Sequence, residues 1–360
     1  VKLSLTTIKI ILPVGISFYT FQTLSYTVDV YRKKIEPVKD LISFAAFVAF
    51  FPQLVAGPIE RATNLVPQLL NKRKYDYLQS VQGIRLIVYG MFKKVVIADS
   101  LAFMVDRIFD NYAQYDGGVL WLGAIYFSIQ IYCDFSGYSD IAIGTSKLLG
   151  IELMSNFKFP YFSRNIGEFW RKWHISLSTW FRDYLYIPMG GSRVKKSKAI
   201  INIIIVFIVS GFWHGANFTF ITWGLIHSLL YLPLFLLNSN RKYLDGTETK
   251  QRLLSYFIEF IKMGITFIFI TITWVFFRSD TIVDAFNYIK IMFFSFQIPQ
   301  SYRYVIFSVL TILSLDWINR KNERDLAIFK TKYRGLVYFI MIWLILSKFN
   351  NQEQFIYFNF

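Results

Sequence analysis

The chain has 360 residues, of which 54% are hydrophobic and 17% charged, and its formal net charge is +16. A water-soluble protein of this size cannot hide so many apolar side chains, and the mean hydropathy of +0.40 also indicates that the lipid bilayer is the solvent. The basic residues lie in short segments between apolar runs, and no soluble fold lies between them. They therefore predict membrane lipid as a partner, and not nucleic acid.

Apolar runs close to the length of about 20 residues that a membrane helix needs recur along the whole chain. They lie near 3–24, 41–59, 84–105, 117–133, 199–212, 218–237, 254–277, 303–318 and 335–349. The runs predict about eight to ten membrane segments. Residues 199–212 and 257–277 are apolar on all sides, whereas barrel strands would alternate, so we expect helices. No linker or fixed-period repeat is visible, and we expect one integral membrane domain over residues 1–360.

Basic clusters flank successive apolar runs at 32–34, 72–74, 193–198, 241–242 and 320–334. Loops rich in Lys and Arg mostly face the cytoplasm, and clusters at both ends of a run that crosses the membrane cannot share one side. We therefore expect some segments to be re-entrant. The chain begins with Val and enters an apolar stretch without a charged leader, which suggests a fragment of a longer protein.

A polar cluster at 134–140 interrupts two apolar stretches and contains Asp134 and Asp140. These carboxylates could shape a substrate cavity, orient a histidine, or accept hydrogen bonds from amides at a helix end, and the sequence favours the last role. The single Cys133 excludes a disulfide within the chain. Its place at the end of an apolar run favours a buried thiol over one that carries an acyl group.

The segment around His174 has the pattern of an amphipathic helix. Asn165 and Glu168 have the spacing typical of a helix N-terminus, and the helix is expected to continue until the Pro and Gly residues at 188–191. Its aromatic and apolar face consists of Trp170, Trp173, Leu177, Trp180, Phe181 and Tyr184. Because Arg182 and other charged residues fall outside this face, we expect the helix to lie at the membrane interface. His174 is then either satisfied by headgroups or a carbonyl, or used in chemistry.

His214 lies at a break between two apolar runs, with Gly211, Gly215 and Asn217 around it. Broken backbone at membrane depth is tolerated where it lines a water-filled cavity or is buried in protein, and an ionisable residue there indicates function. The alternative is a histidine that caps a helix end. If one helix continued from this residue to His227, their side chains would point about 220° apart, so we do not expect both in one site.

Metal or phosphate chemistry finds little support in the sequence. His174, His214, Cys133 and Asp134 are potential ligands, but no tight spacing preforms a metal site. The Gly-Gly-Ser at 190–192 lacks the spacing of a phosphate-binding loop. We therefore expect no bound metal and no resident cofactor.

Several of these motifs together resemble the membrane-bound O-acyltransferase superfamily, specifically its bacterial alginate O-acetylation branch. The segments that carry the resemblance are FPQLVAGP at 51–58, DFSGYSD at 134–140, EFW at 168–170, WHISLSTWFRDY at 173–184, GFWHG at 211–215 and WVFFR at 274–278. The resemblance extends from near residue 11 to the C-terminal residues. Members of the family usually carry about a hundred further N-terminal residues, which agrees with a fragment.

The resemblance implies that His214 is the principal catalytic histidine and His174 the second functional one. It also implies a helical bundle around a tunnel in the bacterial inner membrane, where a cytosolic acetyl thioester such as acetyl-CoA meets the acceptor. The acceptor would be a hydroxyl of an exported polysaccharide, with periplasmic acetyltransferase proteins as partners. Residues that could line the tunnel or contact substrate are Asp134, Trp170, Trp173, Arg182, Trp213 and Asn217. His174, the side chain of Asn217 or a backbone amide near Gly215 could stabilise the oxyanion.

Two other functions remain open on the sequence alone. Related membrane subunits with the same motifs would acetylate peptidoglycan or another wall polymer. A channel or transporter, which is no enzyme, could use His174 and the cluster around Asp134 as a polar pathway through the membrane.

Overall fold

The structure is a computed structural model, and it describes residues 15–244 and 253–349. Within these ranges the chain is helical and contains no strand. The longer helices are α1 (Ile16–Tyr31), α2 (Leu41–Val48), α3 (Ala62–Leu70), α4 (Tyr77–Met91), α5 (Asp99–Asp110), α6 (Gly117–Leu148), α7 (Ile166–Lys172), α8 (Ile175–Phe181), α9 (Lys196–His214), α10 (Phe218–Leu236), α11 (Leu253–Arg278), α12 (Ile282–Phe294), α13 (Ile306–Asn319) and α14 (Arg334–Lys348). Two π-helical segments, η2 (Phe92–Ala98) and η5 (Arg182–Tyr186), and five short 3₁₀ turns join them: η1 (Phe51–Gln53), η3 (Tyr112–Gln114), η4 (Pro160–Phe162), η6 (Arg303–Val305) and η7 (Ala327–Lys330).

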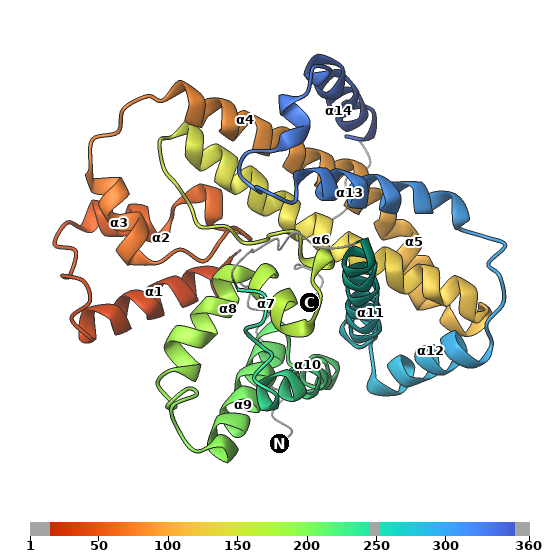
Figure 1. The fold of residues 1–360 in the computed structure, drawn as a ribbon. Coiled ribbons are helices and arrows are strands. Elements are labelled where there is room, and N and C mark those ends of the chain that lie inside the picture. The colour runs from red at the N-terminus through yellow and green to blue at the C-terminus, as the bar shows by residue number, and fades with distance from the viewer. Residues whose placement is uncertain (1–14, 245–252, 350–360) are drawn as a thin grey trace, which may run out of the picture.

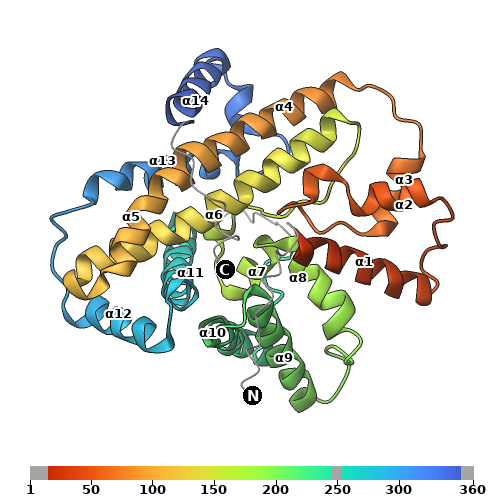
Figure 2. The same ribbon diagram turned by 180° about the vertical axis from the view of Figure 1, so that it is seen from behind.

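Helix α6 forms the centre of the molecule. In the apolar window of α6, 89% of the residues are buried inside the protein. The corresponding share is 28% for α9 and 33% for α10. Helices α4 and α5 pack along α6, and α11, α12 and α13 also contact it (Figures 1 and 2). Because protein surrounds α6, this helix can carry polar side chains that a lipid-facing helix would not tolerate.

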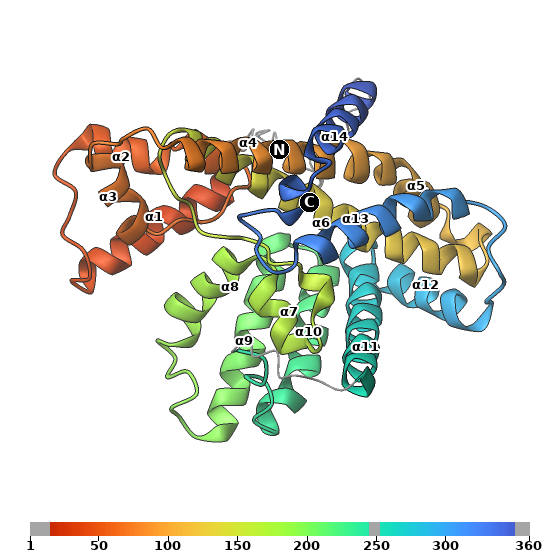
Figure 3. The ribbon, with the colours of Figure 1, turned by 45° about the horizontal axis from the view of Figure 1, so that its top comes forward.

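Helices α9 and α10 form a tight hairpin, with α11 packed against α10. Figure 3 shows these three helices side by side, below a layer that contains α4, α5, α6 and α13. A Cβ atom on Gly211 would lie 2.2 Å from the backbone oxygen of Phe220, and one on Gly224 would lie 2.3 Å from that of Phe207. Glycine is required here because the two backbones approach so closely. The hairpin thereby fixes the position of its turn at residues 214–217.

Four helices in the described part of the chain are long and apolar enough to cross a membrane, namely α6, α9, α10 and α11. The all-α membrane protein predicted from the sequence is confirmed, but four is fewer than the about eight to ten segments expected. Other apolar runs form shorter helices: α13 has 14 residues. A helix of that length rises about 21 Å, which is less than the roughly 30 Å of a bilayer core. Most of the run at 3–24 lies outside the described residues.

The polar cluster at 134–140 does not lie at a helix end, so the role that the sequence favours for its carboxylates is wrong. It lies inside the 32-residue helix α6. The π-helical segment η2 presents two lysines to this stretch: Lys94 pairs with Asp134 at 2.7 Å, and Lys93 pairs with Asp140 at 2.5 Å. Each carboxylate therefore has a cation beside it, and neither depends on amides at a helix end for hydrogen bonds. The π-turn, which is frequent at functional sites, places both lysines on the side that faces α6.

Candidate active site

His174 interrupts a helix that the sequence predicts as continuous. Asn165 caps the start of α7 as predicted, because its side chain accepts a hydrogen bond from the backbone N–H of Glu168. The helix nevertheless ends at Lys172, and His174 adopts a left-handed conformation with φ 42° before α8 begins at Ile175. A strained backbone of this kind costs about 1–3 kcal/mol, so the surrounding structure must hold it in place.

The imidazole of His174 is buried, with 1% of the residue exposed. Its Nδ1 lies 3.1 Å from Oδ1 of Asn156. The backbone carbonyl of Asn156 also accepts a hydrogen bond from the N–H of Ile175 at 2.8 Å. The ring of Phe135 meets the imidazole edge-on, with the centroids 4.5 Å apart. Lipid headgroups cannot satisfy a ring buried in this way, so that alternative is wrong for His174.

Trp213 lies between the two histidines that the sequence singles out. Its ring centroid is 6.0 Å from that of His174 and 4.8 Å from that of His214. His214 is the last residue of α9 and is half-buried. Its ring meets those of Trp223 at 5.4 Å and Phe277 at 5.1 Å. Two imidazoles that are far apart in the chain thus share one aromatic wall, and His214 keeps access from outside.

Asn217 and the amide of Gly215 already have hydrogen-bond partners. Asn217 caps α10 by accepting from the N–H of Thr219 at 3.1 Å, and its Nδ2 donates to the carbonyl of Asp280 at 2.8 Å. The N–H of Gly215 donates to the carbonyl of Phe212 at 3.2 Å. Both groups therefore hold the turn between α9 and α10. Oxyanion stabilisation by either would require that it release its present partner.

Trp173 and Asp134 lie in the packed interior. Trp173 is 3% exposed and packs against Trp274, with the centroids 5.1 Å apart. Asp134 is 2% exposed and is paired with Lys94. The described cavities include neither residue in their walls.

His227 joins three helices and is fully engaged. Its Nδ1 accepts a hydrogen bond from the indole N–H of Trp170 at 3.3 Å. Its Nε2 lies 3.0 Å from the hydroxyl of Thr273, which donates its own proton to the carbonyl of Ile270. Nε2 must therefore carry the proton, and the ring is neutral with both nitrogens occupied. Trp223 packs against it, with the centroids 4.7 Å apart, and also contacts the ring of His214. This geometry indicates a structural histidine.

A cavity of about 750 Å³ lies between the segment 167–186, the α9–α10 hairpin and the loop that follows it. Its walls combine guanidinium groups, hydroxyls and aromatic rings: Trp170, Arg171, Ser178, Thr179, Arg182, Tyr186, Phe207, Ser210, Tyr231 and Arg241. Ser210 lies one helical turn before His214, and Ile175, which follows His174, also lines the cavity. Neither histidine itself lines it. Trp170 and Arg182, predicted to contact substrate, lie in its wall.

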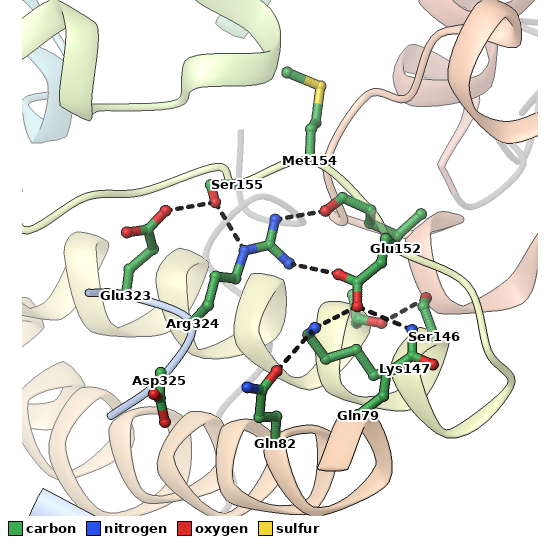
Figure 4. Close-up of polar contacts among 12 residues, drawn as sticks. Gln79, Gln82, Ser146, Lys147, Glu152, Met154, Ser155, Glu323, Arg324 and Asp325 are labelled. Atoms are coloured by element: carbon green, nitrogen blue, oxygen red, sulfur yellow. Dashed lines mark hydrogen bonds and ion pairs between the residues drawn. The ribbon is translucent and has the colours of Figure 1, made fainter. Parts of the chain in front are cut away.

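Asn156 belongs to the segment 151–158, and the loop after α13 holds this segment by hydrogen bonds. The guanidinium of Arg324 donates to Oγ of Ser155 at 3.0 Å and to the carbonyl of Leu153, while Ser155 donates to the carboxylate of Glu323 at 2.8 Å. Figure 4 shows the Arg324 guanidinium between Ser155 and the carboxylate of Glu152. Residues distant in the chain therefore hold the segment that carries Asn156.

Two further carboxylates secure the same segment. Glu152 accepts hydrogen bonds from Lys147 of α6 and from the amide of Gln79 of α4 (Figure 4). Glu60 accepts the backbone N–H of Met154. Burial raises the pKa of Glu60 above its ordinary value. Neither these contacts nor the place of Asn156 could be predicted from the sequence, because none of the residues forms a local motif.

Comparisons with known proteins show which family the sequence is similar to. Residues 38–237 match the membrane-bound O-acyltransferase family. The chain is 43% identical to the probable alginate O-acetylase of Pseudomonas aeruginosa over 284 residues, which are 79% of this chain and 52% of that protein. It is 37% identical to the peptidoglycan O-acetyltransferase of Helicobacter pylori over 79% of this chain and 57% of that protein. It is 31% identical to the teichoic acid D-alanyltransferase of Bacillus subtilis over 64% of this chain and 60% of that protein.

The chain spans about half the length of the alginate relatives that it matches. The family match includes both histidines and most of the cavity wall, and it covers more than half of the residues. On this evidence the chain belongs to the membrane-bound O-acyltransferase family.

Proposed function

We propose that the chain is the catalytic part of a membrane O-acetyltransferase and forms one integral membrane domain. It would move acetyl groups from a cytoplasmic thioester, across the bacterial inner membrane, to hydroxyls of an exported, alginate-like polysaccharide. The observation that carries the proposal is the pair of imidazoles, His174 and His214, on either side of Trp213 in a chain of this family. Acetyl-CoA or another acetyl thioester would be the donor substrate, without a resident cofactor.

The cavity supports entry of the donor from the cytoplasm. The hairpin begins at Lys196 and ends at Leu236, whose carbonyl accepts a hydrogen bond from the Lys196 amine at 3.3 Å. Basic residues at 193–198 and 241–242 flank this end, and such loops mostly face the cytoplasm. From there the cavity follows successive turns of α9 at Phe207 and Ser210 toward His214. A donor bound along this path would bring its thioester close to the imidazole.

His214 would act as the general base. Its neutral imidazole takes the proton from an acceptor hydroxyl while the hydroxyl oxygen attacks the acetyl carbonyl. The thioester C–S bond then breaks, and the leaving thiolate takes the proton back from the imidazolium, so the ester and the free thiol are the products. The aromatic wall around the ring, which includes Trp223 and Phe277, would limit water and so disfavour hydrolysis of the donor.

Replacing Arg241 with glutamine is expected to raise the KM for acetyl-CoA about tenfold, because one charge-assisted hydrogen bond to a phosphate would be lost. Arg241 lines the cavity together with Arg171 and Arg182, and planar guanidinium groups bind phosphate in two-pronged fashion. We expect kcat to stay unchanged, because the arginine lies away from the histidines. Initial rates at varied acetyl-CoA concentration measure both constants.

Lys242→Gln is the matched control, since Lys242 is adjacent but does not line the cavity. An equal rise in KM for the two variants would mean that the effect comes from the general charge of the loop. The cavity would then lose its role as the donor site.

The acceptor has a second candidate, because the Helicobacter pylori relative is a peptidoglycan O-acetyltransferase. Both acceptors offer sugar hydroxyls, and the chemistry at His214 would be the same. Periplasmic acetyltransferase proteins would complete the transfer to the polymer as partners of the full-length protein.

Reconstitution of the full-length protein in liposomes tests the proposal. Labelled acetyl-CoA is supplied on one side, and alginate or peptidoglycan fragments are supplied on the other, with and without periplasmic partner proteins. We expect labelled acetyl esters on one of the polymers. Failure to label either polymer, with active partner proteins present, would contradict the proposed function.

A further inference from the structure

The side chain of Asn156 links the segment that carries His174 to helix α6. Its Oδ1 lies 3.1 Å from Nδ1 of His174, 2.9 Å from Oγ of Ser176 and 3.4 Å from the backbone N–H of Ser176. Its Nδ2 donates to Oγ of Ser139 on α6 at 3.1 Å. The side chain is 1% exposed, so no water competes for these bonds.

These contacts determine which way round the amide sits. The N–H of Ser176 can only donate, so the atom that faces it must be the oxygen of Asn156. The same oxygen faces Nδ1 of His174, and this nitrogen must then carry a proton in order to donate. The neutral imidazole is thereby held as its Nδ1–H tautomer. Its Nε2 keeps a free lone pair.

Nε2 of His174 is buried and has no hydrogen-bond partner within the described residues. A buried nitrogen without a partner is costly, and at a site of this kind it indicates a position that a ligand atom occupies. Trp213 connects this ring to His214, so a ligand at Nε2 would also lie near the principal histidine.

We propose that Asn156 is a positioning residue that makes His174 a hydrogen-bond acceptor for an O–H group of the acceptor sugar. This inference rests on the proposed function and assigns His174 a role within it. The neutral ring has no proton on Nε2, so it cannot donate to an oxyanion, and it binds a hydroxyl instead. The role resembles that of a carboxylate that fixes the tautomer of a catalytic histidine, but here a neutral amide fills it and leaves the ring uncharged.

Asn156→Leu and Asn156→Asp in the full-length protein test the proposal. Leucine removes the acceptor of the Nδ1 proton, and kcat is expected to fall by roughly 10²-fold, the lower end of what a positioned proton acceptor contributes. Aspartate restores an acceptor for Nδ1–H, so it should recover activity at high pH. Its charge also favours the imidazolium, so the acid limb of the pH–rate profile should move up by about 1–3 pH units.

Ser176→Ala is the matched control, because it removes another donor to the same oxygen and leaves the bond to His174 in place. We expect its kcat and pH profile to match the wild type. If Asn156→Leu keeps full activity, or if the aspartate variant shows the wild-type acid limb, Asn156 does not position His174. Membrane abundance and thermal unfolding of each variant identify a mere loss of folding.

A second measurement does not depend on activity. In protein labelled with ¹⁵N-histidine, the ring signals of His174, assigned by their loss in His174→Gln, report the tautomer directly. The wild type is expected to show a protonated Nδ1 and an unprotonated Nε2, and Asn156→Leu a mixture of tautomers. A protonated Nε2 in the wild type would overturn the inference even if the proposed function holds. Absence of acetyl transfer with the expected tautomer would instead contradict the proposed function.

Discussion

His214→Ala is expected to abolish acetyl transfer while the protein still inserts and folds. The imidazole is half-buried at the end of α9, and its loss removes the proposed base, so the rate should fall by about 10²–10⁴-fold. The turn after α9 is expected to persist in the variant, because Asn217 caps α10 and donates a hydrogen bond to the carbonyl of Asp280. Labelled acetate incorporated into polymer, normalised to the amount of protein in the membrane, measures the effect.

Phe212→Ala provides the control for this experiment. Phe212 lies at the same end of α9 and is 59% exposed, so its removal opens no internal cavity and touches neither histidine. We expect transfer close to that of the wild type. Substantial transfer by His214→Ala would remove this histidine from the mechanism, whereas equal losses in both variants would indicate damage to the helix end.

The helices that face lipid could be predicted closely from the sequence. The apolar runs at 199–212, 218–237 and 254–277 correspond to α9, α10 and α11. Their length follows from the thickness of the bilayer, and the start of α10 is encoded locally by Asn217, whose side chain caps the helix. The break that exposes His214 was therefore visible in the sequence, and with it one of the two histidines of the candidate site.

The other part of the site could not be predicted, because contacts distant in the chain produce it. The left-handed backbone at His174 breaks a regular helical pattern, and no residue near it in the sequence signals the break. Asn156 accepts hydrogen bonds from the imidazole of His174 and from the N–H of Ile175. Arg324, which is distant in the chain, holds the segment beside it. The spacing of residue types along the sequence contains no information on these contacts. The resemblance to a family pointed to His174, but its geometry required the fold.

The polar interior of the bundle could not be predicted for a related reason. Charged residues normally mark the end of a membrane helix, yet Asp134 and Asp140 lie in the middle of α6. Their partners, Lys93 and Lys94, lie in a different helical segment and meet them only after folding. These ion pairs could therefore be predicted only if the two segments were already known to lie side by side.

Lys93→Met is expected to destabilise the protein by up to about 3–5 kcal/mol, because it leaves the carboxylate of Asp140, whose side chain is only 19% exposed, without its cation. The side chain of Lys93 is 4% exposed, and its amine lies 2.5 Å from Asp140 and 3.0 Å from Oγ of Ser136. Methionine keeps much of the volume, so little cavity forms. Thermal unfolding of the protein in detergent measures the change. Lys330→Met serves as the control: this lysine pairs with Asp325 but is 55% exposed, and we expect a loss of about 0–1 kcal/mol.

The double variant Lys93→Met with Asp140→Asn separates charge from packing. If the unpaired carboxylate causes the loss, removing its charge should recover most of the stability, because replacing a buried ion pair by neutral groups is often close to neutral. If the double variant is as unstable as the single one, the lysine acts through its contacts with Ser136 and the ring of Tyr89. Recovery would establish that α6 remains one helix through its polar stretch because η2 supplies the opposite charge. The same helix carries Ser139 and Phe135, which contact Asn156 and His174, so the ion pair and the site depend on one element.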